Sequence, residues 1–581
     1  MSRPKKLQTT LTSNYKNFII GNKDEDIDQL DFNDKGKAIS SIDFFNVYIS
    51  PRKPVKLVNY PLIGEDGSEF DISKFSSENI LETLNYDLDL QIERKYKAGF
   101  GSGQEREKFS LEKLIQLFGD GHDEYYLTTQ YDFDEPKKHG DLEEEFNEEG
   151  DEEDDGNENT VDEEDEEEEN DRIKDDNEEE GIDVENPEDE DPEDEDDNEE
   201  EVVEEEEEDK QLPPISINIQ DSDFSDTSSI DMNNLHDDFE ESEEEEEPEE
   251  GDDLLDEELQ LRQSESDQRI KELLQPPLTN LVHHPQVLSI RPQLFSTLIP
   301  QQINLWMGNS SLKDTEIKLN SRDHESLGLG KYIPGGGTSS GLHHDHADNL
   351  YILASGKKRF TLFSPADATK LHTIGSIFKL FNSGIIDYEI NENAPNWKHI
   401  RDDGAILEDI IDWTLENDAV KGEERIKLLN ELQSIIKQQK KFADFIPIKK
   451  LDPPNFSKIP PSLLHIDEFP DEKVRRQLID FANRYFPGFL QLNNYKVWLK
   501  RGEMLYLPAG WFHEVSSFGD KSQGNVNEEG NQKNKLSNVH IALNYWFVPP
   551  NSTNFKHCYE DNYWHQDWSR TQKCLNLIRK E

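Results

Sequence analysis

Residues 341–365 read GLHHDHADNLYILASGKKRFTLFSP, a cluster of histidines and aspartates that leads directly into an apolar, strand-like stretch. Side chains two positions apart on an extended chain face the same way. His343 and Asp345 can therefore converge on one metal ion, whereas His344 and His346 face the opposite side. One imidazole and one carboxylate make up two thirds of the 2-His-1-carboxylate set that holds Fe(II). Such a tripeptide is common by itself, so the interpretation needs a third ligand.

A candidate for the third ligand lies far along the chain, in residues 501–515, RGEMLYLPAGWFHEV. A glycine turn leads into an apolar strand, Pro508–Gly510 bends the chain, and His513 follows two aromatic residues. Without the upstream motif, His513 would be read as a half-buried histidine in an aromatic strand. With that motif, it completes a facial metal site.

Short apolar stretches separated by turns predict a mostly β fold with helical additions, because spacings of about ten residues are typical of barrels and sandwiches. The expected strands are 55–60, 125–131, 302–308, 494–499, 504–507, 512–516 and 540–547. Residues 350–354 and 359–363 are expected to form a hairpin around Ser355–Lys358. Helix-like apolar spacing predicts helices at 42–49, 109–118, 405–416, 423–442 and 472–485.

The net charge of −69 is concentrated in one segment. Residues 141–260 hold 66 acidic and 3 basic side chains, a net charge of −63, which leaves −6 for the rest of the chain. Glu and Asp runs repel one another and bury too little apolar surface to offset the entropy of ordering. We therefore expect a disordered acidic insertion over residues 138–268. Its charge argues against direct nucleic-acid binding and suits basic proteins such as histones or ribosomal proteins.

The chain has two cysteines, Cys558 and Cys574, which form no zinc-binding spacing and are expected to be free thiols in a reducing compartment. Neither an N-terminal signal sequence nor an apolar run long enough to span a membrane is apparent. We expect an intracellular protein, nuclear and/or cytoplasmic, without membrane contact.

Three blocks of this sequence together resemble a known family. HHDHADNLYILASGKKRFTLFSP, RGEMLYLPAGWFHEV and NVHIALNYWF are similar, in order and spacing, to the signature blocks of the JmjC-domain oxygenases of the cupin fold. The likeness is strongest to the JmjC-only protein hydroxylases, a group that includes the asparaginyl hydroxylase of the hypoxia-inducible factor. The resemblance implies a double-stranded β-helix (jelly roll) interrupted by the acidic insertion.

The resemblance also implies the residues of an active site. Fe(II) would be bound by His343, Asp345 and His513, and O2 and 2-oxoglutarate would be the co-reactants. The cosubstrate would contact Lys358, Ser340, Asn349 and Asn544. A lysine at position 358 fits this chemistry, because a buried carboxylate needs a cation. Trp306 is expected to pack beside the site.

The chain departs from the family in two places, at 309–338 and at a largely helical insertion over about 371–490. The expected organisation is a polar N-terminal tail (1–36), an N-terminal part of the JmjC-type fold (37–137), the acidic insertion (138–268), the catalytic core (269–550) and a C-terminal segment (551–581). Loops and insertions near an active site commonly determine which substrate is bound. Because the chain departs from the family in these two segments, the resemblance does not identify the substrate.

The function that the resemblance implies is oxidation of a protein substrate coupled to decarboxylation of 2-oxoglutarate. Hydroxylation of a side chain is the first interpretation. Demethylation of N-methyl-lysine, as in histones, uses the same cofactors, although two cysteines cannot build the zinc module often attached to chromatin demethylases. A third interpretation is non-enzymatic: an acidic scaffold or chaperone for basic proteins. An intact metal triad with Lys358 favours an enzyme.

Overall fold

The computed structural model describes residues 12–130 and 252–580, except residues 24, 35–38, 65–66, 96–98, 102–104, 311–318, 321–326, 418–419, 443–444, 446–451 and 520–535. Most of the predicted acidic insertion lies outside the described residues. The C-terminal end of the predicted insertion is described and is helical, because helix α4 (Asp252–Leu273) begins well before residue 268. Ser266, Arg269 and Ile270 are buried at helical spacing on one face of α4, which explains why this end of the segment is folded.

The larger β-sheet combines strands from the N-terminal part of the chain with strands from the predicted core. Its strands are Asp28–Asp31 (β2), Val55–Val58 (β3), Asp89–Arg94 (β4), Arg106–Ser110 (β5), Tyr125–Leu127 (β6), Pro300–Asn309 (β7), Asp348–Ser355 (β9), Met504–Leu507 (β14) and Val539–Phe547 (β16). Within the described residues their order is β2–β3–β14–β9–β16–β7–β6–β4–β5. The N-terminal part therefore extends both edges of this sheet.

The smaller sheet has the order β13–β10–β15–β8. Its strands are Thr338–Ser339 (β8), Lys357–Phe363 (β10), Tyr495–Lys500 (β13) and Phe512–Phe518 (β15). Buried apolar side chains from both sheets pack together between them, among them Leu353, Phe360, Leu505 and Val515. Two facing sheets that exchange strands along the chain are consistent with the predicted double-stranded β-helix. A third, small sheet joins Thr12–Ser13 (β1), Ile377–Leu380 (β11) and Ile386–Tyr388 (β12).

The predicted hairpin of residues 350–363 is wrong. Strand β9 pairs with β14 and β16, whereas β10 pairs with β13 and β15, so the two consecutive strands belong to different sheets. Only Gly356 separates them, with a φ of 81°, and tight hairpins usually need two loop residues. The chain instead bends at Gly356 and crosses to the other sheet. A Cβ atom at this position would lie 2.6 Å from the Cβ of His540, so the crossing needs glycine.

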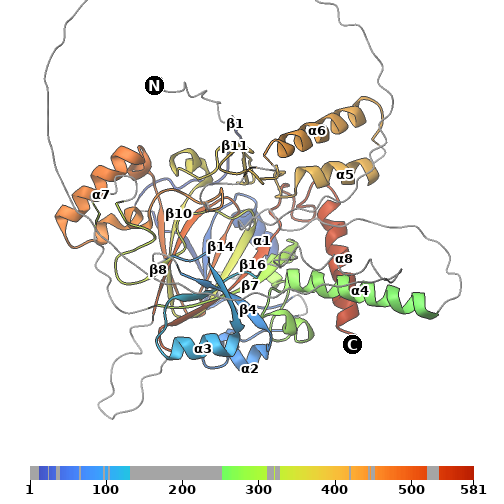
Figure 1. Cartoon of the computed structure of the whole chain (residues 1–581), viewed down its shortest axis with the longest axis horizontal. Helices are drawn as coiled ribbons and strands as arrows, with labels where there is room; N and C mark the ends of the chain where they lie inside the picture. The colour runs from blue at the N-terminus through green and yellow to red at the C-terminus, as the bar shows by residue number, and fades with distance from the viewer. Residues whose placement is uncertain are drawn as a thin grey trace, which may run out of the picture. The chain divides into compact units, whose positions relative to one another are not determined.

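The helices cover the outside of the sheets (Figure 1). They are Ser41–Phe44 (α1), continued by the π-helical turn Phe45–Ile49 (η2), Ile80–Leu84 (α2), Leu111–Gly119 (α3), α4, Leu407–Asn417 (α5), Glu423–Lys440 (α6), Glu472–Tyr485 (α7) and Tyr563–Ile578 (α8). Short 3-10 turns lie at Ile72–Phe75 (η3), Thr279–His283 (η4), Gln293–Phe295 (η5), Pro365–Lys370 (η6), Pro461–Glu468 (η7) and Phe489–Gln491 (η8). Among the described residues, no helix combines the length and the apolar character that a membrane span requires.

Most of the predicted elements are confirmed within two or three residues. Helix α7 and strand β14 match their predicted bounds, while the predicted strand over 125–131 ends at Leu127. The insertion over 371–490 contains α5, α6 and α7 as predicted, together with β11 and β12. Cys558 and Cys574 are free, in agreement with the sequence analysis.

The expected polar tail over residues 1–36 is wrong for its described part. Ile20 is buried, and the ring of Phe18 stacks on Trp511 with 6.2 Å between centroids. Strand β2 pairs in parallel with β3. The isolated apolar residues Phe18, Ile20 and Ile27 join the cluster between the two sheets, a role that their low density along the sequence did not indicate.

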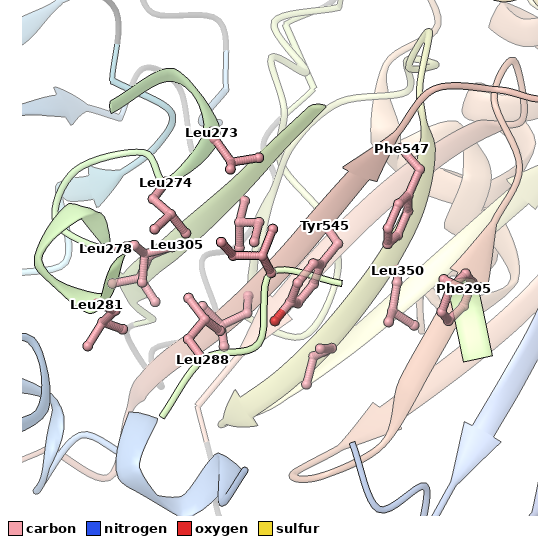
Figure 2. Close-up of a cluster of buried hydrophobic side chains, with 14 of the residues drawn as sticks. Leu273, Leu274, Leu278, Leu281, Leu288, Phe295, Leu305, Leu350, Tyr545 and Phe547 are labelled. Carbon is pink, nitrogen blue, oxygen red and sulfur yellow. The ribbon is translucent and has the colours of Figure 1, made fainter. Parts of the chain in front are cut away.

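The main hydrophobic core lies on the outer face of the larger sheet. Figure 2 shows the residues around Leu274 and Leu281 packed over Leu305, Leu350 and Tyr545. Alternation along the strands places the neighbouring residues on the other face. Trp306, Asn349, Asn544 and Trp546 consequently line a cavity between the two sheets.

Candidate metal centre and cosubstrate pocket

The structure brings together the three residues that the sequence analysis selected as metal ligands. One ligand atom each from His343, Asp345 and His513 lies within 4.8 Å of the others. The His513 Nε2 atom is 3.7 Å from Asp345 Oδ2. His343 and Asp345 lie between β8 and β9, and His513 lies on β15. Their roles as ligands stay a prediction that this convergence supports.

Backbone pairing fixes the relative position of the two histidines. The His343 N–H donates to the His513 carbonyl at 3.0 Å, and the His513 N–H donates to the His343 carbonyl at 2.7 Å. The Nδ1 atoms lie 3.0 Å from the carbonyls of Gly341 and Trp511, respectively. Because a carbonyl only accepts hydrogen bonds, each Nδ1 carries the proton and each Nε2 keeps its lone pair for a metal.

Burial makes charge unfavourable in this centre. It lowers the pKa of His343 well below the ordinary value, and the nearby His513 lowers it further. Burial also raises the pKa of the Asp345 carboxyl. Two imidazole nitrogens and one buried carboxylate are a donor set that fits a divalent cation. The residues present therefore fit Fe(II).

His344 and His346 face away from this centre, as the alternation predicted. The His344 Nε2 atom lies 2.6 Å from the Tyr388 hydroxyl, and His346 Nε2 lies 3.1 Å from the Ile386 carbonyl. Their rings, 4.9 Å apart, are part of the packing behind the centre. These two histidines contact residues of β12 and point away from the candidate metal ligands.

A cavity of about 80 Å³ adjoins the three candidate ligands. It lies between the two sheets, and both contribute to its lining. Besides the candidate ligands, it is lined by Phe100, Gly101, Arg106, Tyr126, Thr128, Thr129, Trp306, Ser340, Asn349, Tyr351, Lys358, Phe360, Phe456, Val515, Asn544 and Trp546. All four residues predicted to contact a cosubstrate are in this set.

Comparison with known proteins agrees with this geometry. The model of the cupin-like domain family matches residues 137–553, more than half of the chain. The chain belongs to the cupin-like domain family. It is also 32% identical over 330 residues to the JmjC domain-containing protein 4 of Schizosaccharomyces pombe. The match covers 48% of this chain and 61% of that relative, so the chain spans less than two thirds of the relative's length.

Lys358 is a buried cation in this cupin-like pocket. Its side chain is 1% exposed, and its Nζ donates to the Tyr126 hydroxyl at 3.0 Å. Within the described part of the chain, no carboxylate forms an ion pair with it. Burial, with a smaller contribution from Lys95, lowers the pKa of Lys358 to about 7. A buried ammonium of this kind fits an anionic group of a ligand.

The other predicted cosubstrate contacts differ in their availability. The Ser340 hydroxyl accepts the Val515 N–H at 3.0 Å and donates to the Gly341 carbonyl at 2.8 Å, so it already joins the two ligand-bearing segments. Asn544 Oδ1 accepts the Trp306 indole N–H at 2.7 Å, which confirms that Trp306 packs beside the site. Asn349 Oδ1 is buried without a hydrogen-bond partner among the described residues.

Sequence reasoning missed several residues of the cupin-like pocket. Tyr126 lies in a predicted strand, and its alternation with Tyr125 could have placed it on the inner face. Trp546 lies two residues after Asn544, and its buried indole N–H lacks a partner among the described residues. Phe456 comes from the helical insertion, where no sequence pattern marked it.

Proposed function

We propose that this protein is an Fe(II)- and 2-oxoglutarate-dependent oxygenase that hydroxylates a side chain of a protein substrate. The observation that carries the proposal is the convergence of His343, Asp345 and His513 beside a cavity that contains the buried Lys358. Similarity to a JmjC domain-containing protein supports it.

The roles of the residues follow from their positions. His343, Asp345 and His513 would hold the iron at the wall of the cavity. Iron, when bound, supplies the activation of O2 that oxidises an otherwise unreactive C–H bond, with 2-oxoglutarate as the electron source. Every further contribution comes from the chain itself.

The chain binds and orients the cosubstrate. The Lys358 ammonium and the Tyr126 hydroxyl, which both line the cavity, would donate to one carboxylate of 2-oxoglutarate. Asn349 and Asn544 supply amide groups to the lining of the same cavity. Aromatic walls, including Trp306 and Phe360, exclude water, so these polar contacts act in a medium of low dielectric constant.

The proposal also names a class of substrate. We propose a protein, and the acidic segment favours a basic one such as a histone or a ribosomal protein, since opposite charges attract. Demethylation of N-methyl-lysine and a scaffold without catalysis are the competing functions.

One experiment separates these functions. The protein is incubated with Fe(II), 2-oxoglutarate, ascorbate and a cell lysate, and mass spectrometry then compares peptides with and without 2-oxoglutarate. A hydroxylase adds one oxygen to a peptide, and a demethylase removes a methyl group. Absence of succinate formation at saturating iron and 2-oxoglutarate would contradict an oxygenase and favour the scaffold.

A further inference from the structure

The first candidate ligand is paired along both sides of its backbone. One side faces His513 on β15, and the other faces residues 455–457 of the helical insertion. The Ser457 N–H donates to the Leu342 carbonyl at 2.8 Å, and the Asn455 side-chain amide donates to the His344 carbonyl at 2.6 Å. The insertion therefore returns to the core directly beside the ligand pair.

Phe456, at the centre of this segment, lies flat against the ligand. The rings of Phe456 and His343 are 4.8 Å apart and only 11° from parallel. Phe456 is 4% exposed and also lines the cavity. The other candidate ligand, His513, has a more distant aromatic neighbour. The ring centroids of Phe360 and His513 are 6.4 Å apart, and the two rings are inclined by 31°.

The other segment in which the chain departs from the family, residues 309–338, also contacts the Phe456 ring. Lys331 Nζ lies 5.0 Å from the centroid of Phe456 and donates to the carbonyls of Phe100 and Ser340 at 3.2 and 3.0 Å. Lys331 is thereby tied to the backbone two residues before Leu342. Both additions to the core thus meet at the phenyl ring that covers His343.

A flat ring against an imidazole restricts rotation about the histidine Cβ–Cγ bond. The hydrogen bond from His343 Nδ1 to the Gly341 carbonyl fixes one orientation of this ring, and the Phe456 face disfavours the others by steric exclusion. In the fixed orientation, Nε2 is directed at the Asp345 and His513 donors. A side chain that filled the same volume without a flat face would impose a weaker restriction.

We propose that Phe456 is a positioning residue of the metal centre, supplied by the helical insertion, which holds the His343 imidazole in its metal-binding orientation by ring stacking. This inference rests on the assignment of His343 as a ligand in the proposed function. If Phe456 has this role, a residue that determines metal affinity lies in the helical insertion, outside the three sequence blocks that resemble the family.

The test compares Phe456→Leu with Phe456→Tyr in the full-length chain. Leucine retains apolar volume without a flat ring, whereas tyrosine keeps the ring. Binding of Mn(II), which replaces the oxygen-reactive Fe(II), is titrated calorimetrically, followed by binding of 2-oxoglutarate to the Mn(II)-loaded protein. Phe486→Leu is the matched control: Phe486 belongs to the same insertion and packs against His372, with 5.3 Å between ring centroids, but His372 is not a candidate ligand.

We expect Phe456→Leu to weaken Mn(II) binding about three- to tenfold, the range of an aromatic pair, and Phe456→Tyr to restore it. Phe486→Leu should leave Mn(II) affinity unchanged. Equal Mn(II) affinities of the wild-type chain and Phe456→Leu would overturn the inference while leaving the proposed function intact, and so would a loss that Phe456→Tyr does not restore. A wild-type chain that binds no Mn(II) would instead overturn the ligand assignment itself.

Discussion

His343 and His513 donate backbone hydrogen bonds to each other's carbonyls, at 3.0 and 2.7 Å, although they lie far apart in the sequence. This pairing brings the segment before β9 and the start of β15 into register. The fold itself therefore fixes the backbone positions of the two candidate ligands. Metal affinity should therefore depend on side-chain chemistry at these positions and only weakly on backbone reorganisation.

Replacement of a candidate ligand should abolish metal binding without unfolding the chain. We expect His343→Ala and Asp345→Asn to lose Mn(II) binding and 2-oxoglutarate turnover, because each removes one of three converging donors. Thermal melts of the metal-free proteins should stay close to wild type, since Asp345 is a buried carboxyl with a raised pKa and stabilises little. Titration calorimetry and succinate release measure the two losses.

His344→Ala is the control for this register. It should keep Mn(II) binding but lower stability by about 1–3 kcal/mol, because the buried Tyr388 hydroxyl loses its partner. The opposite pattern, with His343→Ala active and His344→Ala unable to bind metal, would show that the ligand register is shifted by one residue.

The sequence predicted that His343 and Asp345 face the same way because i and i+2 alternation is a local property of an extended chain, whereas the candidate ligand His513 was found from its distant block and the family resemblance. The sequence also predicted β14 and α7, whose apolar periods are regular. It could not predict which strands pair, since Gly356 sends β10 to the other sheet. Nor could it predict that Phe456 covers His343, because that contact depends on where a long insertion returns to the core.

Lys358→Met should weaken 2-oxoglutarate binding much more than Mn(II) binding. Loss of a hydrogen bond to a charged group costs about 1.5–3 kcal/mol, so the Kd should rise about ten- to hundredfold. Lys357→Met is the matched control, because the neighbouring ammonium lies over Trp498, 4.0 Å from the ring centroid, outside the cavity. If the two substitutions raised the Kd for 2-oxoglutarate equally, another cation than Lys358 would bind the carboxylate of the cosubstrate.

The affinity for 2-oxoglutarate should fall as the pH rises above neutrality. Burial lowers the pKa of Lys358 to about 7, so the free protein loses the ammonium above that pH, and a neutral amine cannot form an ion pair with the carboxylate. The apparent Kd should be flat below about pH 6.5 and rise towards about tenfold per pH unit above about pH 7.5. Calorimetry on the Mn(II)-loaded protein between pH 6 and 9 would reveal this slope. A Kd that is constant over this range would contradict a titrating Lys358.

The buried ion pair between Arg52 and Asp348 should be a major determinant of stability. Asp348 also accepts from the Tyr506 hydroxyl at 2.7 Å and the Ala509 N–H at 2.9 Å. Asp348→Ala would leave the fully buried Arg52 charge without a partner, at a cost of about 3–5 kcal/mol. The exposed pair of Arg476 with Glu472 is the control, since Glu472→Ala should cost less than about 1 kcal/mol. Urea unfolding of both variants gives the comparison, and similar midpoints would contradict it.

The last prediction concerns where the acidic segment ends and the folded chain resumes. Deletion of residues 140–250 should leave stability and uncoupled 2-oxoglutarate turnover near wild type, because this composition cannot form a packed core. Deletion of residues 140–273 should be destabilising, because it removes all of α4, including the buried Arg269 and Ile270. Arg269 of that helix donates to Thr571 of α8 at 2.7 Å and pairs with Asp567, and α4 crosses α8 beside the sheets (Figure 1).

Thermal melts and succinate release of the two deletion proteins, measured side by side, test this boundary. The shorter deletion should also weaken binding to histones, most visibly at low salt, because exposed charges are screened at high salt. Pull-downs at two salt concentrations measure that loss. A shorter deletion that melts well below wild type would mean that residues 140–250 stabilise the fold. A longer deletion that is as stable as the shorter one would mean that α4 contributes nothing to the stability of the fold.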